Sequence, residues 1–216
     1  MPGPTDDIWQ VMSTARAIRR FRADPVDDAL IARCLEAATW APSGGNQQPW
    51  RFVVLTSPEA RQALAAGAAH TLRGIEELYE LQRPDPDDTS RSARATRATF
   101  ALHDGAADVP VAVLFCVEDQ PATPPFSQGG SIYPAMQNFL LAARACGLGA
   151  CLTGWHIGAP EVLREAVGIP DDWHLAGLVI VGWPEGNHGP LRRRPVADVA
   201  ARDRWDRPFV AAAPPI

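Results

Sequence analysis

The sequence contains no lysine: its 20 lysine-or-arginine positions are all arginine. This absence excludes a P-loop lysine, Schiff-base chemistry with pyridoxal phosphate or aldehydes, and a serine–lysine nucleophile. Arginine is nevertheless the better partner for phosphate, because its planar fork can bind two oxygens at once. The chain therefore lacks every lysine-based mechanism but keeps a strong means of recognising phosphate.

Metal-binding and disulfide motifs are also missing. The four cysteines show no C-x-x-C spacing, and the five scattered histidines form no H-E-x-x-H motif. We expect no metal site. There is no signal peptide and no apolar run of membrane length, so we expect reduced thiols in a cytoplasmic protein that does not enter a membrane.

Positive charge is not in excess. The net charge is −5, which disfavours non-specific binding to nucleic acid and excludes a basic field over the whole surface. At 216 residues with 46% hydrophobic content, the chain can bury a core of its own. It shows no internal repeat and no linker, so we assign residues 1–216 to a single domain.

The segment Ala41–Leu55 (APSGGNQQPWRFVVL) is the most informative stretch. It begins with turn-favouring residues, in which proline fixes φ, glycine permits φ > 0, and serine and asparagine bond back to nearby backbone. A helix precedes it, and residues 51–55 are predicted to form a buried strand. Such a loop has free N–H groups and carboxamides that suit a flat, polar ligand edge. The alternative is a plain connector between helix and strand.

Two arginine-rich segments lie near the ends of the chain. The first, residues 15–22 (ARAIRRFR), is either a solvated helix end or a phosphate clamp, because Arg16 and Arg19 are three residues apart and can share a helix face. The second is the run Arg192–Arg194, and such runs are usually solvated. Taken singly, neither segment decides between the two interpretations.

The glycines after the longest predicted helix do not make a dinucleotide-binding motif. In Gly147–Trp155 the third glycine is misplaced, and the glycines follow a helix instead of a strand. Thr153 and Gly154 form either a plain strand end or a place of close backbone approach to a ligand, where small residues are needed.

The remaining pattern alternates between helices and strands. Helices are predicted from residue 7 to 15, 28 to 38, 58 to 70, 129 to 147 and 160 to 167, and strands from 109 to 117 and 173 to 183. Residues 118–128 contain three prolines and are predicted to be a loop. Residues 71–100 fit no clear pattern, and we expect either a mobile cover near a pocket mouth or a surface excursion without function. The tail from Trp205 has apolar groups that need another surface to cover them.

Four of these segments resemble the flavin-dependent nitroreductase family. APSGGNQQPWRFVV is similar to its A-P-S-x-x-N-x-Q-P-W-x-F loop. Residues 15–21 are similar to its R-R-S-[IV]-R-x-F signature, with Ala15 and Ala17 in place of the first Arg and the Ser. GLG at residues 147–149 and RRPV at 193–196 are similar to two later family segments. The resemblance extends from about Arg16 to Val199.

The resemblance implies an α+β fold with a mixed sheet flanked by helices, built as an intertwined homodimer. FMN would lie in two sites at the dimer interface, with the tail 200–216 extended over the partner. NADH or NADPH would be the electron donor, and a small aromatic or quinone-like molecule, such as a nitroaromatic, the acceptor. The flavin would supply the difficult chemistry, so no catalytic acid, base or nucleophile is assigned.

The resemblance also implies the residues that bind the cofactor. The arginines would neutralise the phosphate or lie over the pyrimidine side of the ring. The loop would hold ribityl or ring-edge atoms, with the loop coming from the other subunit. Main-chain groups in the segment after the long helix would approach N5. These residues are Arg16, Arg19, Pro42, Ser43, Asn46, Gln48, Thr153, Gly154, Arg193 and Arg194.

Other functions stay open at this point. The chain could bind a flavin without turnover, for storage or sensing. It could belong to the flavin-fragmenting or dehalogenating branches of the same superfamily, which share these motifs. A cysteine-nucleophile enzyme using Cys151 is the remote alternative, because no His–Asn or His–Asp pattern accompanies it.

Overall fold

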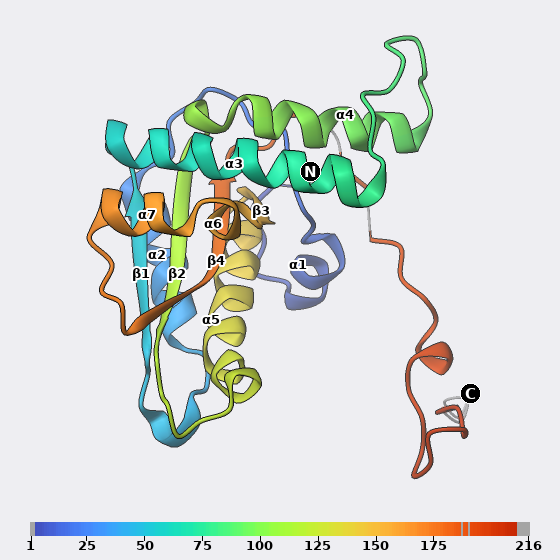
Figure 1. Cartoon of the computed structure of the whole chain (residues 1–216). Coiled ribbons are helices and arrows are strands. Elements are labelled where there is room, and N and C mark those ends of the chain that lie inside the picture. Colours follow the sequence, from blue (N-terminus) through green and yellow to red (C-terminus); the bar gives the residue numbers. More distant parts are fainter. Residues whose placement is uncertain (1–2, 187, 190, 211–216) are drawn as a thin grey trace.

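The computed structural model describes residues 3–186, 188–189 and 191–210 (Figure 1). Helices and strands alternate along the chain, which confirms the predicted α+β class. Their bounds are α1 Ile8–Thr14, α2 Asp28–Thr39, η1 Gly44–Asn46, β1 Trp50–Leu55, α3 Pro58–Tyr79, α4 Arg91–Asp104, η2 Ala106–Asp108, β2 Val111–Glu118, α5 Pro125–Ala145, β3 Gly149–Thr153, α6 Trp155–Gly158, α7 Pro160–Val167, β4 Trp173–Gly182 and η3 Val196–Asp198.

A four-stranded sheet in the order β1-β2-β4-β3 forms the centre of the fold. Its three strand pairs are antiparallel, and an isolated parallel bridge between Ala17 and Ala150 gives the sheet its mixed character. β2 lies inside the sheet and is buried from Val111 to Val117, as its continuous apolar run predicts. The predicted strand at 51–55 is confirmed as β1, but its predicted burial is wrong except at Leu55, because β1 is an edge strand and is only partly covered.

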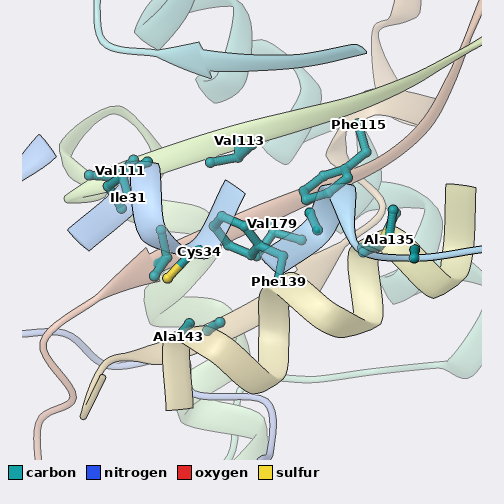
Figure 2. Close-up of a cluster of buried hydrophobic side chains, with 14 of the residues drawn as sticks. Ile31, Cys34, Val111, Val113, Phe115, Ala135, Phe139, Ala143 and Val179 are labelled. Atoms are coloured by element: carbon teal, nitrogen blue, oxygen red, sulfur yellow. The ribbon is translucent and has the colours of Figure 1, made fainter. Parts of the chain in front are cut away.

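Side chains alternate between the two faces of β2, as the two-residue period of a strand requires. Val113 and Phe115 pack with α2 and α5 on one face, in the apolar cluster drawn in Figure 2. Ala112 and Leu114 pack with α3, α6 and α7 on the other face. The sheet is therefore covered on both sides, and the long helix α5 lies at the core as expected.

Two helices are longer than the sequence pattern indicates. α5 begins at Pro125, inside the predicted loop, because proline in the first helical turn needs no N–H partner. α3 continues past His70 to Tyr79, since Leu72 keeps the buried helical face. Most of the range 71–100 is helical, because the end of α3 and most of α4 frame a connection of residues 80–90. The expectation that this range covers a pocket mouth stays a prediction.

The C-terminal residues leave the body of the molecule. In Figure 1 the segment 191–210 runs away from the sheet, with only the short η3 in it. Trp205 is 99% exposed. Coverage of this tail by a partner subunit stays a prediction, and residues 211–216 lie outside the described residues.

Candidate functional site

The first arginine segment is extended and is not part of a helix. α1 ends at Thr14, so the prediction that Arg16 and Arg19 share a helix face is wrong. Tertiary hydrogen bonds hold the segment against the sheet: Ile18 N–H donates to Ala150 O at 2.9 Å, and Arg22 N–H donates to Trp183 O at 2.9 Å. The side chain of Ile18 is buried and anchors the segment.

Arg16 and Arg19 nevertheless line one cavity, of about 640 Å³. Its walls come from this extended segment, from the first turns of α4 and from the chain after β4. The lining residues are Arg16, Ala17, Arg19, Arg20, Arg91, Arg94, Ala95, Ala98, Glu185, Gly186, His188, Gly189 and Arg192. The volume lies within the range of about 300–1,000 Å³ that is typical of small-molecule sites.

The cavity is strongly cationic. Six arginines face it, and Glu185 is the one acidic residue in its described lining. Glu185 forms an ion pair with Arg20 at 2.8 Å, which leaves five arginines without a carboxylate in that lining. Arg16 donates to Gly189 O at 3.0 Å, which joins the extended segment to the chain after β4. Such a site fits a phosphate-bearing ligand in an otherwise acidic protein.

His188 adds no charge to this cavity near neutral pH. Burial lowers the pKa of His188, and Arg16 and Arg20 lower it further, against the opposite effect of its hydrogen bond to Glu185. His188 Nε2 donates to Glu185 O at 2.9 Å. The imidazole therefore acts here as a neutral hydrogen-bond donor that holds the loop.

The second arginine segment contributes only its first member to the cavity. Arg192 lines it, whereas Arg193 is exposed and donates to Arg192 O at 3.0 Å. Arg194 lines a separate hollow formed by the tail around Trp205. Within one chain, Arg193 and Arg194 are thus not brought to Arg16 and Arg19, and their predicted role stays a prediction.

Thr153 and Gly154 lie where β3 ends and α6 begins. Thr153 Oγ1 donates to Leu178 O at 3.4 Å, and Gly154 O accepts from Thr71 Oγ1 at 3.3 Å. Leu152, the preceding residue, is exposed at the same edge of the sheet. Neither Thr153 nor Gly154 is among the residues that line the arginine cavity, so their predicted role stays a prediction.

The polar loop has a tight internal structure. Ser43 Oγ accepts from Gln48 N–H at 3.0 Å, and Gln48 Nε2 donates to Asn46 Oδ1 at 3.3 Å. Asn46 and Gln48 have φ of 56° and 53°, in the left-handed region that non-glycine residues seldom adopt. Such backbone strain is typical of binding loops. The N–H groups of Asn46 and Gln47 donate within the turn, to Ser43 O and Gly44 O, so these N–H groups are not free for a ligand.

The loop and the arginine cavity lie at opposite corners of the sheet. The loop, with Pro42, leads into Trp50, which pairs with Val117 at one end of β2. The cavity lies beyond Val181 and Gly182, which are at the other end of the strands and next to β3 (Figure 1). One chain therefore does not bring these two groups of predicted residues together.

Some lining residues were not predicted as ligands. Arg91 and Arg94 lie in the range 71–100, to which no ligand was assigned, although a spacing of three residues is typical of one helix face. Arg20 and Arg192 adjoin predicted residues and were not assigned to the site. Cys151 is buried, and burial raises the pKa of its thiol, which argues against a nucleophilic role.

Other classes of site are not found in the described part of the chain. No group of three or more His, Cys, Asp or Glu side chains there could hold a metal ion. All four cysteines are free thiols. Of the helices that the structure describes, none is long and apolar enough to cross a membrane.

The structure shows an α+β protein with a strongly cationic cavity, and comparison with known proteins gives its family. A model of the nitroreductase family matches residues 12–183. The chain belongs to the nitroreductase family, as its four sequence segments predict.

Its relatives differ in the activity that they are named for. The chain is 31% identical over 196 residues to a 5,6-dimethylbenzimidazole synthase of Rhodospirillum rubrum, covering 87% of this chain and 86% of that protein. It is also 31% identical over 213 residues to an NADH dehydrogenase of Thermus thermophilus, covering 91% and 96%. An FMN- and NADPH-dependent nitroreductase from Sphigopyxis sp. strain HMH superimposes with a TM-score of 0.69 at 26% identity, covering 92% of this chain and 100% of that one.

Proposed function

We propose that this protein is an FMN-dependent oxidoreductase that uses NADH or NADPH to reduce a small aromatic or quinone-like acceptor. The observation that carries the proposal is the cavity lined by six arginines, which lies where the segment bridged to β3 at Ala150 meets the chain after β4. Bound FMN would supply the electron transfer between donor and acceptor. The chain's own residues would bind it, orient it and set its electrostatic environment.

The described residues fit this cofactor at its phosphate end. Arg16 and Arg19 would neutralise the phosphate or face the pyrimidine side of the ring, and Thr153 and Gly154 would present main-chain groups to it. The loop with Ser43 lies too far along the sheet to join them in one chain. We therefore propose a homodimer, in which that loop of one subunit completes the site of the other.

The test is an anaerobic titration of the purified, flavin-loaded protein with NADH and then with NADPH. Bleaching of the flavin absorbance by either donor, followed by its return when a quinone is added, is the expected result. Bound flavin that neither donor bleaches would leave a non-catalytic flavin-binding protein as the better interpretation. A protein that takes up no FMN would contradict the whole proposal.

A second candidate function comes from one specific relative. The 31% identity with a 5,6-dimethylbenzimidazole synthase favours the flavin-fragmenting branch as the alternative. The two candidates predict different fates for the flavin in air. A fragmenting enzyme would consume reduced FMN and release a benzimidazole, whereas a reductase would return FMN intact through repeated cycles. Chromatography of the flavin before and after aerobic turnover separates them.

A further inference from the structure

The first turns of the core helix α5 carry two buried polar side chains. Gln128 is 8% exposed and Ser131 is 7% exposed. The two residues are three apart in the sequence, so they lie on one face of the helix. Burying a polar group is costly unless it forms hydrogen bonds. The partners of Gln128 and Ser131 therefore indicate what these side chains do.

Ser131 and a second residue of the same helix face hold the chain around the start of the polar loop, residues 41–48. Ser131 Oγ accepts from Gly44 N–H, inside the loop, at 3.3 Å. Asn138, two turns further along α5, donates from Nδ2 to Ala37 O, near the end of α2, at 3.1 Å. The loop and the helix before it are thus both fastened to α5.

Gln128 holds a second segment against the polar loop. Its Nε2 is shared among three acceptors in residues 119–123, which are two backbone carbonyls at 3.0 and 3.2 Å and the Asp119 carboxylate at 3.5 Å. Gln120, in the same segment, donates from its own Nε2 to Gln47 Oε1 at 2.9 Å. Gln128 therefore supports the polar loop through the segment that follows β2.

The polar loop needs external support because its own side chains do not anchor it. Residues 44–48 are all exposed, so apolar burial does not fix their conformation. Asn46 and Gln48 have positive φ, and such strained backbone persists only where surrounding contacts enforce it. The hydrogen bonds from α5 and from Gln120 are contacts of this kind. They hold the loop in one conformation before it meets a ligand.

We propose that Gln128 and Ser131 are positioning residues for the cofactor site of the partner subunit. They act through the polar loop, which they hold in the conformation that completes that site. The inference rests on the proposed function, in which the loop of one subunit meets the arginine cavity of the other. Without these side chains the loop is free to move, and FMN would have to order it on binding, at a cost in affinity.

The first test measures the Kd of FMN for the full-length, flavin-depleted protein and its variants. Gln128→Met keeps most of the side-chain volume but removes its hydrogen bonds, and Ser131→Ala removes the hydroxyl. Each should raise the Kd by about 2- to 10-fold, as for loss of a neutral hydrogen bond. Ser131→Thr, which keeps a hydroxyl, should restore the affinity. The matched control is Gln62→Met, at an exposed position of α3, which should leave the Kd unchanged.

Melting temperatures of the same flavin-free proteins separate positioning from general stability. Gln120→Met covers the case in which Gln128→Met does not fold, because Gln120 is only half-buried and its contact with Gln47 is the last link to the loop. It should weaken FMN binding at an unchanged melting temperature. Variants that melt at lower temperature but bind FMN with wild-type affinity would show a purely structural role and overturn the proposal.

Mixed dimers test whether the support acts across the interface. One subunit carries Gln128→Met with Ser131→Ala, the other carries Arg19→Gln, and two different affinity tags isolate the mixed species. We expect one site of wild-type affinity in each dimer, where an intact arginine cavity meets an intact loop, and one site with both defects. Two sites that are each weakened would show that the loop acts within its own subunit, which contradicts the proposal.

Failure of this proposal is distinct from failure of the proposed function. If NADH or NADPH bleaches the bound flavin while the variants of Gln128, Gln120 and Ser131 bind FMN like wild type, the positioning role is rejected and the reductase stands. If neither donor bleaches the bound flavin, the reductase fails. The comparison of Kd values and the mixed dimers then still decide the positioning role.

Discussion

Ile18 lies so close to Gly149 that a Cβ atom on Gly149 would come within 2.8 Å of its Cγ1 and Cγ2 atoms. Ile18 is also tied to β3 by its backbone hydrogen bond to Ala150. The contact fixes the middle of the segment that carries Arg16 and Arg19. The shape of the arginine cavity therefore depends on a glycine in the edge strand of the sheet.

Replacing this glycine should disturb stability and ligand binding together. Gly149→Ala should lower the free energy of unfolding by about 1–3 kcal/mol, because the added methyl overpacks a buried contact. It should also weaken the binding of FMN, because the segment that carries Arg16 and Arg19 must move.

Urea unfolding measures the effect on stability, and flavin titration measures the effect on binding. The control is Gly74→Ala in α3, where a Cβ meets nothing within 4 Å and a gain of about 0.5–1 kcal/mol is expected. Wild-type stability and affinity in Gly149→Ala would show that the contact does not shape the site.

Arg193→Ala should weaken FMN binding by about 1.5–3 kcal/mol, as for loss of a charge-assisted hydrogen bond. Arg192→Ala is the informative companion, because Arg192 is the member of the run that lines the cavity in one chain. Arg207→Ala, farther along the tail, is the control. Unchanged FMN affinity in Arg193→Ala would show that Arg193 does not bind the cofactor. A loss of FMN affinity in Arg192→Ala alone would assign the phosphate contact to Arg192.

We expect a stable dimer. Tyr133, Leu152, Ile157 and Trp205 are large apolar residues that one chain leaves exposed, and they need another surface. Light scattering should give about twice the chain mass of 23.3 kDa. Removal of residues 200–216 should raise the dimer dissociation constant. A stable monomer that turns over at working concentration contradicts both the dimer and the shared site.

Stability should fall as the solution is acidified, partly because of His156. Its side chain is buried with Nδ1 unpaired in the described structure, and burial lowers the pKa of His156 against a smaller opposing effect of its hydrogen bond to Thr153. On acidification, this imidazole is therefore protonated in the unfolded chain before it is protonated in the folded protein. The contribution of His156 to the free energy of unfolding is complete above about pH 6.5 and decreases as the pH falls below that value.

The measurement is urea unfolding at several pH values from 7.5 downward. His156→Gln should reduce the slope of stability against pH in this window, whereas His70→Gln, at an exposed position of α3, should not. An unchanged slope in His156→Gln would show that another group, such as His188, causes the loss.

Donor and acceptor should compete for one site. Initial rates against donor concentration at several acceptor concentrations should give parallel double-reciprocal lines, the pattern of two half-reactions. The arginine cavity is the proposed site of the flavin, and donor and acceptor would have to reach that flavin in turn. Lines that intersect would require a ternary complex and a second binding site.

Much of the fold follows from local sequence. The apolar run 109–117 gives β2, the helical period of Ile132, Met136 and Phe139 gives α5, and the loop chemistry of residues 42–48 gives the strained turn. These features depend on side-chain periodicity and on the φ preferences of nearby residues. Both can be read from the sequence without knowledge of the fold. The family resemblance rests on the same short segments.

The site itself was decided by tertiary contacts. The local pattern predicts that residues 15–22 are the end of a helix. In the structure, hydrogen bonds to Ala150 and Trp183, which are distant in sequence, hold these residues extended. The same long-range packing brings Arg91 and Arg94 to Arg16. No local period encodes which cations share a cavity, because that depends on which strand edges and helix ends meet when the sheet is assembled.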